Sequence, residues 1–228
     1  MAWSPKAKPT AIPGRPVARD KAFIWATHLA KALGADVPCW WAGWFKAHFQ
    51  HFKVERDAEN LPIWNREHNE LMRAKRVELE RAGWRCDVED VNKFTIRGKV
   101  ADVAGKPDLV AFDGDQVVVV DGKTGRPRES DAWQVRIYIY GLQLARPTLG
   151  TKDVSGLVHY KKAADRVIEN PTLEDIERIE AGILIMGDAK APERSPSEWQ
   201  CGRCDIHVAD CPKRWQESQR LTAATSRF

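Results

Sequence analysis

An apolar hairpin in the middle of the chain constrains the fold more than any other segment. Two apolar runs, 109–112 and 117–120, are separated by Asp113-Gly114-Asp115. This combination favours two antiparallel strands joined by a tight turn. Glycine at the first position of a two-residue turn, Gly114-Asp115, suits the positive φ that such a turn requires. We therefore expect a hairpin whose strands carry mostly apolar side chains.

The pairing of these strands brings three charged residues to the open end of the hairpin. With a turn at Gly114-Asp115, Asp108 faces Asp121. Because side chains along a strand alternate between faces, Asp121 and Lys123 project on the same side as Asp108. A turn that begins one residue earlier keeps all three on that side, whereas a three-residue turn would separate them.

Carboxylates that oppose each other across two strands destabilise the pairing unless a cation lies close to them. Lys123 is one candidate cation. A divalent metal ion is another, because carboxylate oxygens are suitable ligands for Mg²⁺ or Mn²⁺. The alternative is a pair of solvated aspartates at the strand ends beside a lysine, and the hairpin by itself leaves both interpretations open.

The motifs around this hairpin resemble those of the PD-(D/E)XK nuclease superfamily. Gly105-Lys106-Pro107-Asp108, followed by a strand that ends in Asp121-Gly122-Lys123, resembles the nuclease signature. Gln134 and Tyr138 resemble the Gln-x-x-x-Tyr motif of the RecB-like branch, and His68 lies where that branch has a metal-binding histidine. Without the resemblance, the histidine would be interpreted as a surface residue, and the glutamine and tyrosine as the flank of a helix.

The resemblance implies a restriction-endonuclease-like α/β core with a divalent metal ion, Mg²⁺ or Mn²⁺. Asp108 and Asp121 would bind the ion, and His68 and the carbonyl of Gly122 would complete its ligands. An ion bound in this way lowers the pKa of a bound water and stabilises charge on the scissile phosphate. These ligand roles follow from the resemblance and are expectations for the structure.

The resemblance also implies a catalytic role for three further side chains. Lys123 would orient the attacking water and offset phosphate charge. Gln134 and Tyr138 are one helical turn apart and therefore lie on one face of their helix. They would steady Lys123 or contact the DNA backbone.

Three cysteines near the C-terminus have the spacing of a metal site. Two residues separate Cys201 from Cys204, and six separate Cys204 from Cys211. Spacing of this kind lets thiolates reach one metal centre. Five cysteines without an export signal argue against a disulfide framework. Three residues are candidates for the fourth ligand: Cys39, Cys86 and His207. Spacing alone does not separate zinc from an iron–sulfur cluster.

The resemblance favours an iron–sulfur cluster. RecB-like nucleases with a cluster, including AddB-type and CRISPR-associated ones, have one cysteine before the nuclease core and three after it. The resemblance therefore implies a [4Fe–4S] cluster bound by Cys39, Cys201, Cys204 and Cys211, with Zn²⁺ as the alternative metal. Cys86 is expected to be a small buried residue on a strand. The cluster would join the N-terminal helices to the C-terminal segment.

The remaining pattern predicts an α/β fold with a central mixed sheet flanked by helices. Predicted helices span about 21–33, 40–52, 64–82, 130–145 and 171–186, and predicted strands lie in 86–96, 109–112, 117–120 and 154–160. Prolines and basic residues in 1–18 favour a flexible basic leader. We expect 19–228 to form a single nuclease domain, with N-terminal helices and a C-terminal tail joined by the metal cluster.

Charge and hydropathy exclude some classes of protein. A net charge of +4 permits a nucleic-acid partner but does not require one. No segment is apolar enough to cross a membrane, and residues 1–20 lack the apolar core of a secretory signal, so a cytoplasmic protein is expected. Gly122-Lys123-Thr124 imitates the end of a phosphate-binding P-loop, but Val117 occupies the position where that loop needs glycine. An NTPase is therefore excluded.

Together these observations predict a metal-dependent DNA nuclease, an exonuclease or end-processing enzyme that prefers single-stranded DNA. The alternatives are a non-catalytic DNA-binding or assembly subunit with the same fold and cluster, and a zinc-binding adaptor. Because no motor is encoded, we expect a helicase, recombinase or integrase as a partner protein. DNA repair, recombination and CRISPR adaptation all use nucleases of this type.

Overall fold

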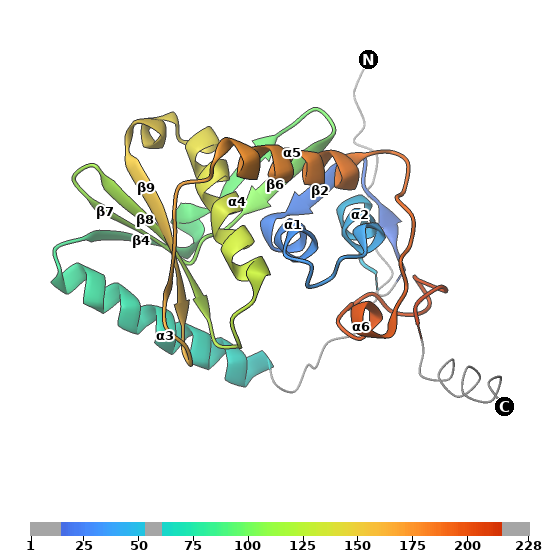
Figure 1. Ribbon diagram of the computed structural model, residues 1–228, viewed down its shortest axis with the longest axis horizontal. Helices are drawn as coiled ribbons and strands as arrows, with labels where there is room; N and C mark the ends of the chain where they lie inside the picture. Colours follow the sequence, from blue (N-terminus) through green and yellow to red (C-terminus); the bar gives the residue numbers. More distant parts are fainter. Residues whose placement is uncertain (1–14, 53–60, 216–228) are drawn as a thin grey trace, which may run out of the picture.

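The predicted hairpin forms the centre of a mixed five-stranded sheet. The computed structural model describes residues 15–52 and 61–215. The strands of this sheet are β4 (Arg85–Val88), β7 (Leu109–Asp113), β8 (Gln116–Lys123), β9 (Asp153–Tyr160) and β10 (Arg166–Ile168). Their order is β10-β9-β8-β7-β4 (Figure 1). β8 runs parallel to β9, and the other neighbouring pairs are antiparallel.

The turn of the hairpin is the predicted two-residue turn. Asp113 pairs with Gln116, so the two residues between them connect the strands. Gly114, the first of these, has a φ of +56°, a conformation that glycine adopts without the strain of a side chain. The same register, continued one residue past the last pair, brings Asp108 opposite Asp121.

Two helices cover opposite faces of this sheet, α3 (Leu61–Arg81) and α4 (Glu129–Ala145) (Figure 1). The side chains of β8 alternate between them. Val117 and Val119 are buried in the cluster that includes the side chains of α4. Val118 and Val120 belong to a second cluster, which includes Met72 of α3. Both faces of β8 are therefore covered, and this explains the continuous apolar run in its sequence.

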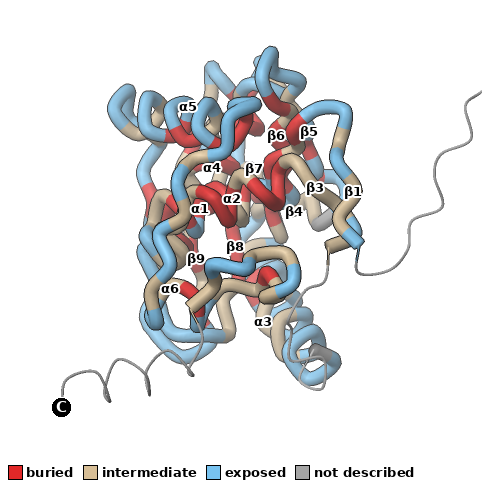
Figure 2. The backbone as a smooth tube through the Cα atoms, turned by 90° about the vertical axis from the view of Figure 1, so that its right-hand side faces the viewer, coloured by how far each residue is buried: buried red, intermediate tan, exposed pale blue. Residues whose placement is uncertain are grey.

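A second, three-stranded sheet lies beside the first. It is formed by β2 (Ala22–Trp25), β6 (Ala101–Gly105) and β5 (Phe94–Arg97), with β6 in the middle. Helices α1 (Ala26–Leu33), α2 (Trp40–His48) and α5 (Leu173–Gly187) pack around it. A two-stranded pair joins β1 (Val17–Ala18) to β3 (Phe49–Gln50). Short helical turns span η1 (Glu89–Asn92), η2 (Pro147–Thr151) and α6 (Glu198–Cys201). Buried residues concentrate where α1, α2 and α4 meet the strands (Figure 2).

The structure differs from the sequence expectation mainly in its short strands. In the predicted helix 21–33, residues 22–25 form the strand β2 instead. The helix predicted over 40–52 ends at His48. The predicted strand 86–96 is divided by η1 into parts of two sheets. β6 and β10 were not predicted, because strands of three to five residues are stabilised by pairing with distant segments. Most of the predicted leader lies outside the described residues, and its positions 17–18 form β1.

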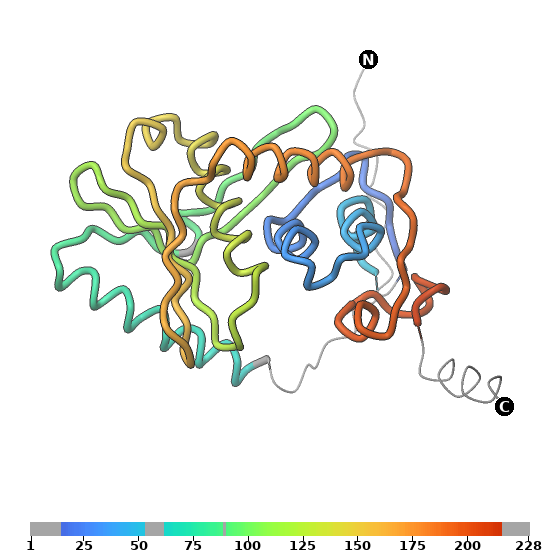
Figure 3. Tube along the Cα trace, viewed as in Figure 1, coloured from blue at the N-terminus to red at the C-terminus, as the bar shows by residue number. Residues whose placement is uncertain are grey.

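Segments far apart in the sequence meet at the cysteine-containing end of the molecule. The chain around α6 lies beside α2 (Figure 3). Ile206, fully buried, packs in one cluster with Trp41 and Phe45 of α2. Lys46 of α2 forms an ion pair with Asp205. The C-terminal segment is therefore anchored to the N-terminal helices by apolar and charged contacts. None of the helices in 15–52 and 61–215 combines the length and apolar character needed to span a membrane.

Candidate active site

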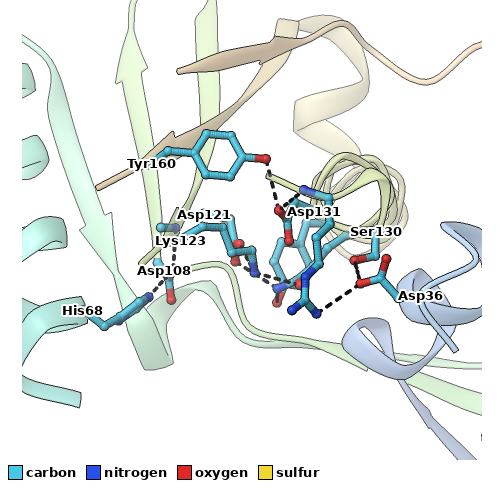
Figure 4. A network of polar contacts seen from close by, with 12 residues as sticks. Asp36, His68, Asp108, Asp121, Lys123, Ser130, Asp131 and Tyr160 are labelled. Atoms are coloured by element: carbon cyan, nitrogen blue, oxygen red, sulfur yellow. Dashed lines mark hydrogen bonds and ion pairs between the residues drawn. The ribbon is translucent and has the colours of Figure 1, made fainter. Parts of the chain in front are cut away.

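Three side chains from β8 and α4 form a closed set of polar contacts (Figure 4). Lys123 Nζ lies 2.6 Å from Asp121 Oδ2 and donates a hydrogen bond to Gln134 Oε1 at 3.0 Å. Gln134 Nε2 donates to Asp121 Oδ1 at 2.9 Å and to the hydroxyl of Tyr138 at 2.8 Å. Asp121 and Lys123 therefore share the face of β8 that packs on α4, as strand alternation predicts.

A second set of contacts links Asp108 to α3. Asp108 Oδ2 accepts a hydrogen bond from the backbone N–H of Gly122 at 2.8 Å and lies 3.1 Å from His68 Nε2. Asp108 precedes β7, so its carboxylate can reach past the strand end toward α3. The structure thus brings His68, Asp108, Asp121, Lys123, Gln134 and Tyr138 together at one end of the hairpin.

Gly122 allows α3 to approach the sheet at this point. A Cβ atom at this position would lie 2.4 Å from Met72 Sδ and 3.4 Å from His68 Nε2. From the sequence, Gly122 was expected only to supply its carbonyl as a metal ligand. The structure gives it two other functions: its N–H binds Asp108, and its missing side chain leaves space for the helix that carries His68.

Burial and charge perturb the ionisation of these groups. Asp121 is only 2% exposed, and this burial raises its pKa to about 6 against the opposing effect of Lys123. The hydrogen bond to Asp108 raises the pKa of His68. Burial would lower the pKa of Lys123, but the Asp121 carboxylate raises it further, so the ammonium form is favoured. Burial raises the pKa of Tyr138 well above its usual value, which keeps its hydroxyl protonated.

Polar contacts at the start of α4 orient this helix (Figure 4). Asp131 Oδ2 accepts hydrogen bonds from the backbone N–H of Arg128 at 2.9 Å and from the hydroxyl of Tyr160 at 3.0 Å. Ser130 Oγ donates to Asp36 Oδ2 at 2.6 Å. These contacts tie α4 to β9 and to the loop after α1. They fix the position of Gln134, which lies about one turn further along α4.

Trp64 is a neighbour of the site that the sequence analysis missed. Its ring stacks on that of His68, with centroids 5.1 Å apart and planes at 21°. Trp64 is nevertheless 48% exposed. The sequence indicated this contact, because Trp64 and His68 are four residues apart and therefore lie on one face of a helix. Among ten tryptophans in the chain, however, position alone did not separate it from the core residues.

The four predicted cluster ligands converge, although they come from distant parts of the chain. Cys39, Cys201, Cys204 and Cys211 all line one small cavity of about 20 Å³ between α2 and α6. Cys86 is elsewhere, on β4 in the apolar cluster beneath α3, and it is half-buried there and not buried as expected. His207 does not line the cavity. Burial raises the pKa of Cys204 and Cys211, and the neighbouring thiols Cys39 and Cys201 also raise that of Cys211.

The described side chains are arranged to pair with one another. Within residues 15–52 and 61–215, no three His, Cys, Asp or Glu side chains form a group that could hold a metal ion as they stand. At the hairpin, the carboxylates of Asp108 and Asp121 face His68, Gly122 N–H, Gln134 and Lys123. Asp121 Oδ2 is buried, and the ammonium group of Lys123 contacts it at 2.6 Å.

Comparison with known proteins identifies the family. One solved structure, the crystal structure of SSO0001, aligns with 88% of this chain and 91% of its own, at a TM-score of 0.47 and 17% identity. A likeness at that level carries no argument about function. No curated protein sequence matches the chain. The family model of the PD-(D/E)XK nuclease superfamily matches residues 30–212, a region that contains the hairpin, His68, Gln134 and the four converging cysteines. The chain belongs to the PD-(D/E)XK nuclease superfamily.

Proposed function

We propose that this protein is a Mg²⁺- or Mn²⁺-dependent deoxyribonuclease that hydrolyses phosphodiester bonds at the end of the β7–β8 hairpin. Nucleases of its superfamily generally use these ions. The observation that carries the proposal is the position of Lys123. Its ammonium group is held beside Asp121 and Gln134, within the field of Asp108 and His68. An intact set of acidic, basic and amide groups is what metal-assisted hydrolysis requires.

The chemistry of the donor atoms at this site suits a divalent cation. Asp121 Oδ2 is a buried carboxylate oxygen beside the Lys123 ammonium, and carboxylate oxygens are suitable ligands for Mg²⁺ and Mn²⁺. Asp108 and His68 supply further oxygen and nitrogen ligands, and the Gly122 carbonyl is the fourth predicted ligand. When bound, the ion supplies a water of lowered pKa and positive charge for the phosphate.

The side chains of α4 support the chemistry by fixing Lys123. Gln134 accepts from Lys123 and donates to Asp121, so its amide holds the two charges at a set separation. The hydroxyl of Tyr138 accepts from the same amide and thereby fixes which end of it faces the lysine. Lys123, half-buried, then presents its remaining protons to water and to the phosphate.

Single-stranded DNA or a DNA end is the substrate that we propose, with exonuclease or end-processing action. The half-exposed indole of Trp64 stacks on His68, a proposed metal ligand, and supports the preference for unpaired DNA. An exposed aromatic ring beside the reacting phosphate can stack with an unpaired base, whereas the bases of a duplex are already stacked on each other.

Cleavage of end-labelled single-stranded DNA tests the proposal. With Mg²⁺ or Mn²⁺, the wild type should degrade the DNA, and both Asp121→Ala and Lys123→Ala should reduce the rate by at least about a hundredfold. Lys162→Ala removes an exposed lysine outside these contacts and serves as the control. Equal activity of all four proteins would disprove the proposed site. DNA binding without cleavage under either ion would instead support the non-catalytic subunit.

We further propose that Cys39, Cys201, Cys204 and Cys211 bind a [4Fe–4S] cluster, as in the RecB-like branch. Support comes from their convergence on one cavity, from which Cys86 is absent. Several thiolates at one place repel each other, so a cationic centre is needed to hold them ionised. Protein purified without oxygen should be brown and contain iron. A colourless protein with zinc and no iron would establish the alternative metal.

Three further properties stay predictions. They are a helicase, recombinase or integrase as a partner, a role in repair, recombination or CRISPR adaptation, and a cytoplasmic location. Affinity capture under mild conditions, followed by identification of proteins with motor or strand-transfer activity, is the direct test of the partner. Recovery of the chain without any such protein would count against that prediction. The Asp121→Ala variant should capture the same partner, because the substitution is confined to the nuclease contacts.

A further inference from the structure

A cavity of about 290 Å³ opens beside the candidate active site, between α3 and the start of β7. Its wall includes His68 and Asp108, the two residues that link α3 to the hairpin. The cavity is therefore continuous with the site where the phosphodiester bond would be cleaved. Its volume lies at the lower end of the range of small-ligand pockets, about 300–1,000 Å³. It has space for one small ligand and not for a duplex.

The lining of the cavity includes two positively charged side chains. Arg73 and Arg76 line it, one and two turns along α3 from His68. Arg76 forms an ion pair with Glu80 at 2.7 Å, which compensates part of its charge. Arg73 is exposed and, in the part of the chain that the structure describes, forms no ion pair or side-chain hydrogen bond. A guanidinium group can donate two parallel hydrogen bonds to a phosphate, so Arg73 is available for an anionic ligand.

Apolar side chains also line the cavity. They are Met72, Leu109 and Val88, and the last two pair across β4 and β7. Asn69 adds an amide that can donate and accept hydrogen bonds. A nucleotide combines groups that suit this mixed lining, with a phosphate at one end and a flat, largely apolar base with polar edges at the other. A free phosphate or a carboxylate would use only the charged side chains.

We propose that this cavity binds one nucleotide of the substrate, next to the scissile phosphate, with Arg73 contacting its phosphate. This inference rests on the proposed nuclease function, and it adds the position of the neighbouring nucleotide. The arrangement explains why α3 carries an arginine without a protein partner on the side that faces Asp108. It also gives α3 two tasks, since the same helix carries His68 and Trp64.

Equilibrium binding of deoxythymidine 5′-monophosphate in Mg²⁺ tests the subsite without any cleavage step. Arg73→Gln should weaken binding about tenfold, the low end for a lost charged hydrogen bond, because the side chain is exposed. Arg81→Gln, on the same helix but outside this cavity, should change binding less than about twofold if the contact is specific. Thymidine, which lacks the phosphate, should bind the wild type and Arg73→Gln equally.

Kinetics on single-stranded DNA provide the second measurement. Arg73→Gln should raise KM and leave kcat nearly unchanged, because the contact is to a part of the substrate that does not react. The subsite is overturned if the monophosphate does not bind the wild type at millimolar concentration, or if Arg73→Gln and Arg81→Gln weaken it equally. Cleavage by the wild type together with either result would leave the nuclease proposal intact. Specific binding without any cleavage would support the subsite and reject the nuclease.

Discussion

Replacing Gln134 with leucine should change the pH at which the protein binds its divalent ion. Gln134 is 9% exposed, and its Nε2 donates to Asp121 Oδ1 at 2.9 Å. A hydrogen bond to a charged group contributes roughly 1.5–3 kcal/mol. Because one pKa unit corresponds to about 1.4 kcal/mol, losing this bond should raise the pKa of Asp121 by roughly 1–2 units. From the wild-type value of about 6, the pKa would reach roughly 7–8.

The change in the pKa of Asp121 determines how much the affinity for the metal ion falls. A carboxylate must lose its proton to bind the ion, so binding weakens as the pH falls through its pKa. At pH 7 about nine tenths of the wild-type Asp121 would be ionised, against roughly a tenth to a half in Gln134→Leu. We expect the affinity for Mg²⁺ at pH 7 to fall roughly two- to tenfold. Most of this loss should be recovered at pH 9.

Isothermal titration with Mg²⁺ between pH 5 and 9 measures this effect, and thermal unfolding of each protein verifies that it is folded. Gln143→Leu makes the same chemical change about two and a half turns along α4, away from the contacts of Asp121, and is the matched control. Its binding curve should follow that of the wild type. A midpoint for Gln134→Leu that coincides with the wild-type midpoint would refute the assigned hydrogen bond and its effect on Asp121.

Three further predictions follow from individual contacts. Gly122→Ala places a Cβ 2.4 Å from Met72 Sδ, so it should weaken Mg²⁺ binding by pushing the Met72 side chain against its neighbours around His68, and addition of Met72→Ala should restore it; equal affinities of the single and double variants would contradict this. Cys39→Ser should remove most of the iron from protein purified without oxygen, whereas Cys86→Ser should retain it; equal iron contents would reject the ligand set. Burial raises the pKa of Asp205, but Lys46 lowers it more, so the folded-state value lies below the unfolded one. Its stabilisation is therefore complete above the unfolded pKa and lost as the pH falls through the folded value, and urea unfolding from pH 6 to pH 2 should show less acid destabilisation in Asp205→Asn than in the wild type.

The sequence by itself determined the hairpin and the identity of the charged residues at its end. Local physical rules were sufficient there: two apolar runs, a glycine at a turn that needs positive φ, and alternation that places Asp121 and Lys123 on one face. The helical spacing of Gln134 and Tyr138 was likewise local, and the observed hydrogen bond between them follows from it. Spacing also grouped the three C-terminal cysteines.

Only the tertiary structure decided which partner each of these groups has. His68 is forty residues from Asp108 in sequence, and their contact depends on how closely α3 approaches Gly122. The convergence of Cys39 with Cys201 depends on the packing of Ile206 against α2. The short strands β2, β6 and β10 likewise depend on distant neighbours. Sequence patterns report interactions within a few residues, whereas these contacts are made by segments that meet only when the core is packed.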